Sequence, residues 1–335
     1  MKASLRDISE KTGVSITTVS RVLNGKGDEF GISKDTQERI YLSAKELSYV
    51  PNQTGVNLQS GRTRTIALIV PGLVNPFFAN IASSLATEIQ GTGYNTLISD
   101  SNENIEIEKD ELKQMISRNV DGIIIASAGQ DGSHINEIDD MGIPIVCIDR
   151  YFDNLQVPFV ATDNYLGAEM ATDHLLKRGH THIACIQGAN QSMPNIHRIK
   201  GFEHTMNTHG IQDCTITGSD FTVQNGYTET LLLLQNQPLP TAIFTLSNTI
   251  ALGCMKALKE NNVRVPEDVS LITFDNHPYL DYLSTPLTCV AQPFQDICRI
   301  AIRLLFSMIE KKDLKTRQVL LRPEILIRNS VNRLA

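Results

Sequence analysis

From Thr65 onward, short apolar runs rich in β-branched residues alternate with stretches of helical periodicity. Near-continuous apolar strands separated by helices are typical of parallel sheets that helices cover on both faces. About 270 residues follow this pattern, which is more than one such sheet comfortably holds. We therefore expect two α/β lobes with a ligand cleft between them at the carboxyl ends of the strands. The expected strands are 65–70, 95–99, 122–126, 145–148, 159–162, 182–187, 242–246, 269–274 and 287–291, and the expected helices are 77–90, 106–119, 164–178, 199–208, 224–234, 249–261 and 294–310.

The first 50 residues carry a different pattern, with three signals for helix starts. Ser4 and Asp7 have the spacing of a capping box, and Ser15 and Ser33 can cap two further helices. Gly13 supplies a tight turn between the first two helices. Two short helices joined by such a turn, with a third helix in support, make a helix-turn-helix module, whose second helix enters the DNA major groove. Its expected small core is Ile8, Val14, Val19, Val22 and Leu23.

The exposed side of the second helix carries groups suited to DNA. Small hydroxyls suit phosphates, Arg21 can bridge guanine O6 and N7, and Ile16 can contact a thymine methyl. A solvent-facing polar helix of some other small helical domain is the alternative. The residues concerned are Ile16, Thr17, Thr18, Ser20 and Arg21.

The charge is unevenly distributed. The formal net charge is −7, but residues 1–64 hold ten Lys and Arg against seven Asp and Glu, whereas residues 65–335 hold 20 against 30. A basic head on an acidic body indicates that only the head contacts a polyanion.

Several classes of protein are disfavoured. No apolar run approaches the ~18 residues of a membrane span, and the N-terminus has no hydrophobic signal core, so we expect a cytoplasmic protein without membrane contact. The chain has no GxGxxG, GxxxxGK[ST] or GxSxG motif, so we expect no enzyme and no cofactor. His174, His180 and His182 lack ligand spacing and favour a structural role over a metal site. The six cysteines are expected to be buried free thiols.

Three segments resemble the lactose-repressor (LacI/GalR) family of bacterial transcription regulators: LRDIS at 5–9, GVSITTVSRVLN at 13–24 and YVPN at 49–52. The resemblance covers essentially the whole chain. It implies an all-α helix-turn-helix domain at 1–50, a hinge helix or linker at 51–63, and an α/β effector-binding and dimerisation domain at 64–335. That domain would have two lobes like those of periplasmic binding proteins, with lobe 1 at about 64–160 and 292–320, and lobe 2 at about 161–291 plus the C-terminal segment.

By this resemblance, the head residues receive roles on DNA. Ile16, Thr17 and Arg21 would read bases, and Leu58 would be a wedge inserted into the minor groove at a kink. The candidates for phosphate contacts are Ser4, Arg6, Ser15, Thr18, Asn24, Ser33, Thr36 and Tyr49.

The body also resembles periplasmic sugar-binding proteins of the ribose-binding type. Aromatic rings would cover the C–H faces of a sugar, while carboxylate and guanidinium groups would bridge adjacent hydroxyls. Ser247 and Asn248 replace the usual Asn-Asp pair, which leaves the sugar open. The effector-binding candidates are Asn75, Phe77, Phe78, Asp149, Arg150, Arg198, Phe221, Ser247, Phe274, Asp275 and Gln292.

The expected function is that of a homodimeric, sequence-specific regulator of double-stranded operator DNA, a repressor controlled by a monosaccharide or a sugar phosphate. The alternative is a sugar-binding protein or carbohydrate enzyme whose head docks another protein. Whether the effector releases or tightens DNA stays open, with release by a catabolic sugar as the favoured direction.

Overall fold

The computed structural model describes residues 3–50, 62–211, 214–236 and 238–334. The chain forms two compact units, Met1–Thr63 and Arg64–Ala335. Within the described residues, no helix is long and apolar enough to cross a membrane.

The first unit is a three-helix domain made of α1 (Leu5–Thr12), α2 (Ile16–Leu23) and α3 (Lys34–Glu46). Each helix begins at the serine expected to cap it, and Ser4 forms the full capping box with Asp7. Gly13 turns the chain at φ +69°, a conformation that favours glycine. The predicted core is confirmed: Val14 and Leu23 pack at its edge, and it is centred on Ile8, Val19, Val22, Ile40 and Ala44.

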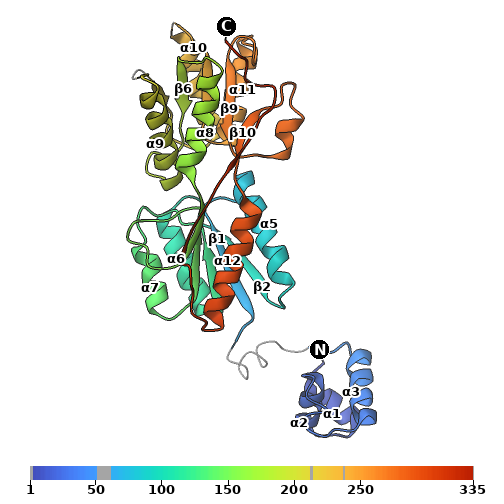
Figure 1. The fold of residues 1–335 in the computed structure, drawn as a ribbon. Coiled ribbons are helices and arrows are strands. Elements are labelled where there is room, and N and C mark those ends of the chain that lie inside the picture. Colours follow the sequence, from blue (N-terminus) through green and yellow to red (C-terminus); the bar gives the residue numbers. More distant parts are fainter. Residues whose placement is uncertain (1–2, 51–61, 212–213, 237, 335) are drawn as a thin grey trace. The chain divides into compact units, whose positions relative to one another are not determined.

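Lobe 1 of the second unit is built on a parallel sheet with strand order β11-β5-β4-β3-β1-β2. Helices α5 and α12 cover one face of this sheet, and α6 and α7 cover the other (Figure 1). Its strands are β1 (Thr65–Val70), β2 (Asn95–Asp100), β3 (Gly122–Ile125), β4 (Ile145–Ile148), β5 (Phe159–Thr162) and β11 (Gln318–Leu321), and its helices are α5 (Pro76–Gln90), α6 (Ile105–Ser117), α7 (Ser133–Asp140) and α12 (Phe294–Ile309).

Lobe 2 repeats the architecture with strand order β12-β10-β9-β8-β6-β7, in which only β12 is antiparallel to its neighbour. Helices α8 and α9 pack on one face, and α10 and α11 on the other. Its strands are β6 (Ile183–Ile186), β7 (Thr215–Thr217), β8 (Ala242–Thr245), β9 (Ser270–Phe274), β10 (Thr288–Ala291) and β12 (Glu324–Leu326), and its helices are α8 (Asn164–Lys177), α9 (Met193–Thr208), α10 (Val223–Gln235), α11 (Asn248–Glu260) and the 3-10 turn η1 (Pro278–Asp281).

Every strand expected from the sequence is present, within one or two residues at its ends. The strands that the sequence did not reveal are β7, β11 and β12, all at sheet edges and largely outside the buried core. Edge strands bury less, so they lack the continuous apolar run that predicted the others. Helix α9 begins at Met193, before the expected 199, because Pro194 is tolerated in a first helical turn.

The cysteine prediction is also confirmed, since all six thiols are free and only Cys214 is not fully buried. His180 has the structural role expected of it. Its ring nitrogens lie 3.1 Å from Thr241 Oγ1 and 3.0 Å from the carbonyl of Asn332.

Candidate functional site

Helix α2 presents the predicted base-reading residues away from the core of the head. Val19 and Val22 are buried on its inner side, whereas Ile16, Thr17 and Arg21 are exposed. An exposed isoleucine beside hydroxyl and guanidinium groups fits a surface that meets base edges.

Arg21 has a partner that sequence reasoning missed. Its guanidinium carbon lies 3.9 Å from the centre of the Phe30 ring, in a cation–π contact. Phe30 is half-exposed in the loop between α2 and α3, so the ring steadies Arg21 without taking its hydrogen-bond donors. In the sequence, Phe30 stands out only as a lone aromatic residue in a polar loop, and nothing else there indicated this contact with Arg21.

The phosphate-contact candidates cluster at helix starts. The side-chain oxygens of Ser4, Ser15 and Ser33 accept hydrogen bonds from the backbone N–H groups of the residues three positions on. Thr18 and Thr36 place their hydroxyls 2.9 and 2.8 Å from the capping Ser15 and Ser33. These helix N-termini suit anions.

The other residues predicted to contact DNA lie in different environments. Asn24 is exposed at the end of α2, and Tyr49 packs against the core of the head. Arg6 makes an exposed ion pair of 3.1 Å with Glu10, which is weak enough to exchange for a phosphate. Leu58 lies outside the described residues.

In the second unit, the structure brings ten of the eleven predicted effector residues around one pocket between the lobes. The exception, Phe274, is a correction: its ring is buried in the core of lobe 2 beneath Arg198. Phe274 is the last residue of β9 and its ring packs in the core, whereas Asp275 follows the strand with φ +70° and lines the pocket. Sequence reasoning missed three further lining residues, Glu103, Ser192 and Pro194.

On the lobe 1 side, Arg150 is buried and forms a two-pronged ion pair with Glu103. Its Nη1 donates to Glu103 Oε2 over 2.8 Å, and its Nη2 donates to Oε1 over 2.6 Å. Asn75 caps α5 and so places Phe77 and Phe78 at the pocket. Asp149 follows β4 with φ +64°, a sharp turn at the strand end that directs the chain into the cleft.

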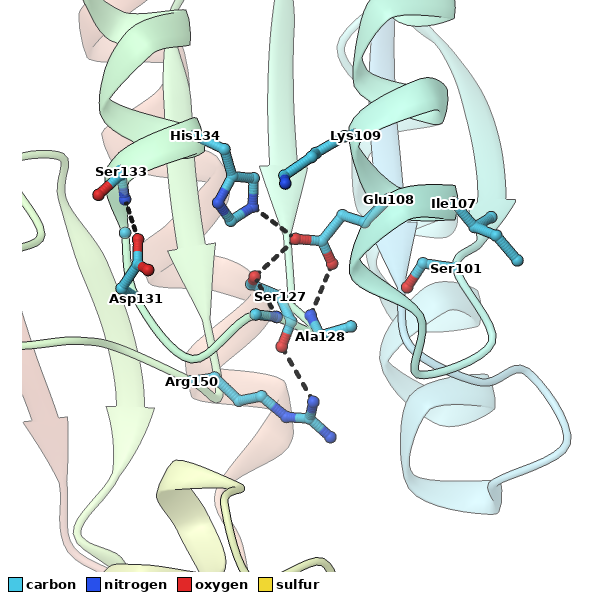
Figure 2. A network of polar contacts seen from close by, with 12 residues as sticks. Ser101, Ile107, Glu108, Lys109, Ser127, Ala128, Asp131, Ser133, His134 and Arg150 are labelled. Carbon is cyan, nitrogen blue, oxygen red and sulfur yellow. Dashed lines mark hydrogen bonds and ion pairs between the residues drawn. The ribbon is translucent and has the colours of Figure 1, made fainter.

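A buried network behind Arg150 fixes the loop that supports it (Figure 2). Glu108 is fully buried, and its carboxylate accepts hydrogen bonds of 2.6 Å from Ser127 Oγ and the backbone N–H of Ala128. His134 Nε2 lies 2.8 Å from the same carboxylate. The carbonyl of Ser127 in turn accepts from Arg150 Nη1 over 2.9 Å, so Glu108 positions Arg150 through this loop.

On the lobe 2 side, Arg198 is held by neutral groups. Its Nε donates to Asn164 Oδ1 over 2.8 Å and its Nη1 to the carbonyl of Leu246 over 2.6 Å. The guanidinium lies 3.7 Å from the centre of the Phe274 ring and 3.9 Å from Asp275 Oδ1. Asp275 also accepts a 2.6 Å hydrogen bond from Gln292 Nε2.

The two aspartates are titration-sensitive. Burial raises the pKa of Asp149 to about 6, although Arg150 and Arg198 oppose the rise. Burial also raises the pKa of Asp275, opposed by Arg198 and Gln292.

Several buried polar atoms at this pocket have no hydrogen-bond partner among the described residues. They are Asp149 Oδ1, Arg150 Nε, Ser192 Oγ and Gln292 Oε1. Leaving such atoms unsatisfied is costly, so donors and acceptors that converge on one pocket indicate a polar ligand.

Two protein-family profiles match this chain. Residues 4–52 match the profile of bacterial regulatory proteins of the lacI family, and residues 172–331 match that of a periplasmic binding protein-like domain. The ribose operon repressor of Halalkalibacterium halodurans is 32% identical over 327 residues, covering 98% of this chain and 96% of that protein. This chain belongs to the LacI family. It is a DNA-binding transcriptional regulator, as the sequence predicted.

Two solved structures support the fold of this LacI-family chain. The lac repressor dimer bound to operator and the anti-inducer ONPF has a TM-score of 0.90 at 23% identity, covering 99% of this chain and 100% of that one. A LacI-family regulator from Enterococcus faecium with bound ribose has a TM-score of 0.74 at 28% identity, covering 81% and 100%. The predicted helix-turn-helix head and two-lobed α/β domain are therefore confirmed.

Proposed function

We propose that this LacI-family regulator is a homodimeric repressor whose affinity for operator DNA is controlled by a sugar bound between lobes 1 and 2. The observation that carries the sugar is the set of unsatisfied buried atoms: Asp149 Oδ1, Arg150 Nε, Ser192 Oγ and Gln292 Oε1. They offer both donors and acceptors, which a ring with several hydroxyls can satisfy at once.

The apolar part of the pocket complements these polar groups. Phe77, Phe78 and Phe221 line it from both lobes and present ring surfaces to the C–H faces of a sugar. Phe221 lies so close to the backbone of Gly188 that a Cβ there would come within 2.2 Å of the ring. Gly188 is therefore needed to seat this aromatic wall. The ribose bound to the Enterococcus faecium relative supports the same ligand class.

On the DNA side, Arg21, Ile16 and Thr17 would read bases from α2, and the capped helix starts would contact phosphates. A homodimer reads two symmetric half-sites, so the operator should be a near-palindrome. The lac repressor dimer bound to its operator supports this assembly.

The switch would arise from the two-lobed site. A ligand that contacts Asp149 in lobe 1 and Asp275 in lobe 2 favours whichever lobe arrangement satisfies both, by the difference in its affinity for the two states. If that arrangement changes DNA affinity, DNA must change ligand affinity by the same factor. We favour release from DNA when the sugar binds.

The test uses the full chain and an operator selected from random duplex DNA. A thermal-shift screen of monosaccharides and sugar phosphates identifies ligands, and gel shifts measure operator affinity with each one. We expect Asp275→Ala to keep operator binding and lose the response to the sugar. Asp173→Ala, at a partly buried position of α8 where the aspartate pairs with Lys177, is the control that should respond normally. A normal response in Asp275→Ala would refute the site.

A further inference from the structure

The ion pair of Arg150 and Glu103 lies where two cavities between the lobes meet. The pocket that gathers the predicted effector residues has a volume of about 30 Å³, and the cavity beside it has about 630 Å³. Arg150 and Glu103 line both of them. The smaller volume is too small for a sugar ring, so a ligand must extend into the larger cavity, where it meets this ion pair.

Glu103 occupies both terminal nitrogens of Arg150. Nη1 donates to Glu103 Oε2 over 2.8 Å, and Nη2 donates to Oε1 over 2.6 Å. Nη1 also donates to the carbonyl of Ser127 over 2.9 Å. These two nitrogens form the fork with which an arginine binds a phosphate or carboxylate group in two-pronged fashion. An anionic ligand would therefore have to displace Glu103 before Arg150 could bind it in this way.

Arg150 keeps one donor for an uncharged ligand. Its Nε is buried without a hydrogen-bond partner among the described residues, and it lies 3.9 Å from Asp149 Oδ2. A single N–H group can donate to a hydroxyl oxygen of a ligand. Because this donor lies beside a second carboxyl group, it offers no separate binding site for an anion.

The loop that carries Glu103 has a backbone conformation that its own contacts enforce. Asn102 and Glu103 have φ angles of +50° and +53°, which residues other than glycine rarely adopt. The carboxylate of Asp100 accepts hydrogen bonds of 2.8 Å from the backbone N–H groups of Leu73 and Asn102. The N–H of Glu103 donates to the carbonyl of Pro71 over 2.8 Å. These contacts place the backbone of Glu103 independently of its ion pair.

Glu103 also brings a negative charge to the cleft. Its side chain is 52% exposed, whereas that of Arg150 is 5% exposed. Among the described residues, the other charged groups that line the two cavities belong to Asp149, Arg198, Asp220 and Asp275. A half-exposed carboxylate repels an anion and accepts hydrogen bonds from ligand hydroxyls, so it favours an uncharged polar ligand.

We propose that Glu103 determines which charge the effector can carry: by holding both terminal nitrogens of Arg150, it restricts the cleft to uncharged ligands. Without the Glu103 carboxylate, Arg150 becomes a group that binds anions. This inference rests on the proposed function, because it concerns the ligand of the same cleft. A sugar phosphate or a sugar acid should therefore be a poor effector, although the sequence alone left the sugar phosphate open.

Isothermal titration of the full chain with inorganic phosphate tests the role of Glu103 without any sugar. Glu103→Gln should raise the affinity for phosphate about tenfold or more over the native chain. Glu106→Gln makes the same change of charge at a residue that is 76% exposed, pairs with Lys109 and lines neither cavity, so it should change the affinity less than about twofold. Glu103→Gln combined with Arg150→Gln should lose the gain, because phosphate would bind through Arg150.

Matched pairs of compounds then test the selectivity of the cleft. Ribose is compared with ribose 5-phosphate, and glucose with glucuronate. In the native chain, we expect the neutral member of a pair to bind about tenfold or more tightly than the anion. Glu103→Gln should shift this ratio about tenfold or more toward the anion, whereas Glu103→Asp, which keeps the charge, should keep the native preference. A merely structural loss would weaken both members alike and leave the ratio unchanged.

Each contrary result has a distinct meaning. If the native chain binds an anion as tightly as its neutral partner, Glu103 does not exclude anions and the proposal is overturned. If Glu103→Gln weakens both members of a pair alike and gains no affinity for phosphate, Glu103 is a structural residue and the proposal is overturned as well. If the native chain binds operator but none of the sugars, the sugar effector is rejected, and the phosphate titration alone decides whether Glu103 controls Arg150.

Discussion

The head and the effector cleft hold their functional side chains in opposite ways. In the head, the polar groups assigned to DNA find partners within a few residues, as Ser15 does with Thr18 and Arg6 with Glu10. In the cleft they are buried, and their partners lie far along the chain: Arg150 and Glu103 are 47 residues apart, and Arg198 and Leu246 are 48. A local motif thus specifies the DNA surface, whereas the cleft depends on the whole α/β topology.

This contrast has an energetic side. Exposed partners in the head exchange readily with water, so single changes there should alter DNA binding more than stability. Buried partners in the cleft cannot be replaced by water without cost, so changes there should affect both folding and ligand response.

The largest expected effect follows from removing Arg198. Arg198→Ala leaves buried Asp275 without its cation and leaves Asn164 and the Leu246 carbonyl without their donor. We expect a loss of about 3–5 kcal/mol in the free energy of unfolding, measured with urea on the full chain. A loss below about 1 kcal/mol would show that the cleft tolerates change as the head does.

The second prediction concerns pH. Burial raises the pKa of Asp149 from 3.8 to about 6, so ionisation of this carboxyl disfavours the folded state above pH 6 by about 3 kcal/mol. The penalty is fully present above pH 6 and disappears as the pH falls through 6 to about 4, because the folded protein takes up the proton first. Asp149→Asn should therefore unfold less readily than the native chain at pH 7 and equally at pH 4. Urea titrations of both proteins at pH 7 and pH 4 check this. A difference in the free energy of unfolding that is the same at both pH values would contradict it.

The third prediction moves to the head. Arg21→Ala should weaken binding to the selected operator by about 1–3 kcal/mol, because a bidentate guanine contact carries base information. Binding to random duplex DNA should change little. Arg6→Ala should instead weaken both duplexes equally and lessen the dependence on salt. Gel shifts on both duplexes measure these affinities. If Arg21→Ala weakened binding to the operator and to random duplex DNA equally, Arg21 would be a phosphate contact.

The smallest expected effect is the loss of one helix cap. Ser15→Ala removes the acceptor of the Thr18 backbone N–H and should destabilise the start of α2 by about 1 kcal/mol. Hydrogen exchange of the α2 amides in the full chain measures this. Ser20→Ala on the same helix removes only the acceptor of a side-chain hydrogen bond from Asn24 Nδ2 and serves as the control. Equal exchange in both variants would mean that the cap contributes nothing.

The sequence predicted the residues that line the pocket better than it predicted the buried residues that hold them in place. Ten predicted residues line one pocket because strand ends in parallel sheets meet at one edge, a consequence of topology that the apolar runs already implied. Glu103 and Glu108 gave no such signal, since each lies near the start of α6 and reads as an ordinary helix-start carboxylate. Their roles depend on Arg150 and Ser127, which only the folded chain brings near them.

The sequence by itself determined the three helices of the head, their caps and the exposed face of α2, because each depends on residues within one or two helical turns. It also determined the fold class, because apolar strands and helices alternate along about 270 residues. The tertiary structure decided which side chains reach the cleft. It placed Phe274 beneath Arg198 while Asp275 faces the pocket, and it buried Asp149 Oδ1 and Gln292 Oε1 without a hydrogen-bond partner among the described residues. The physical reason is that burial and pairing in the cleft arise between segments tens of residues apart, and no local pattern encodes the distance between them.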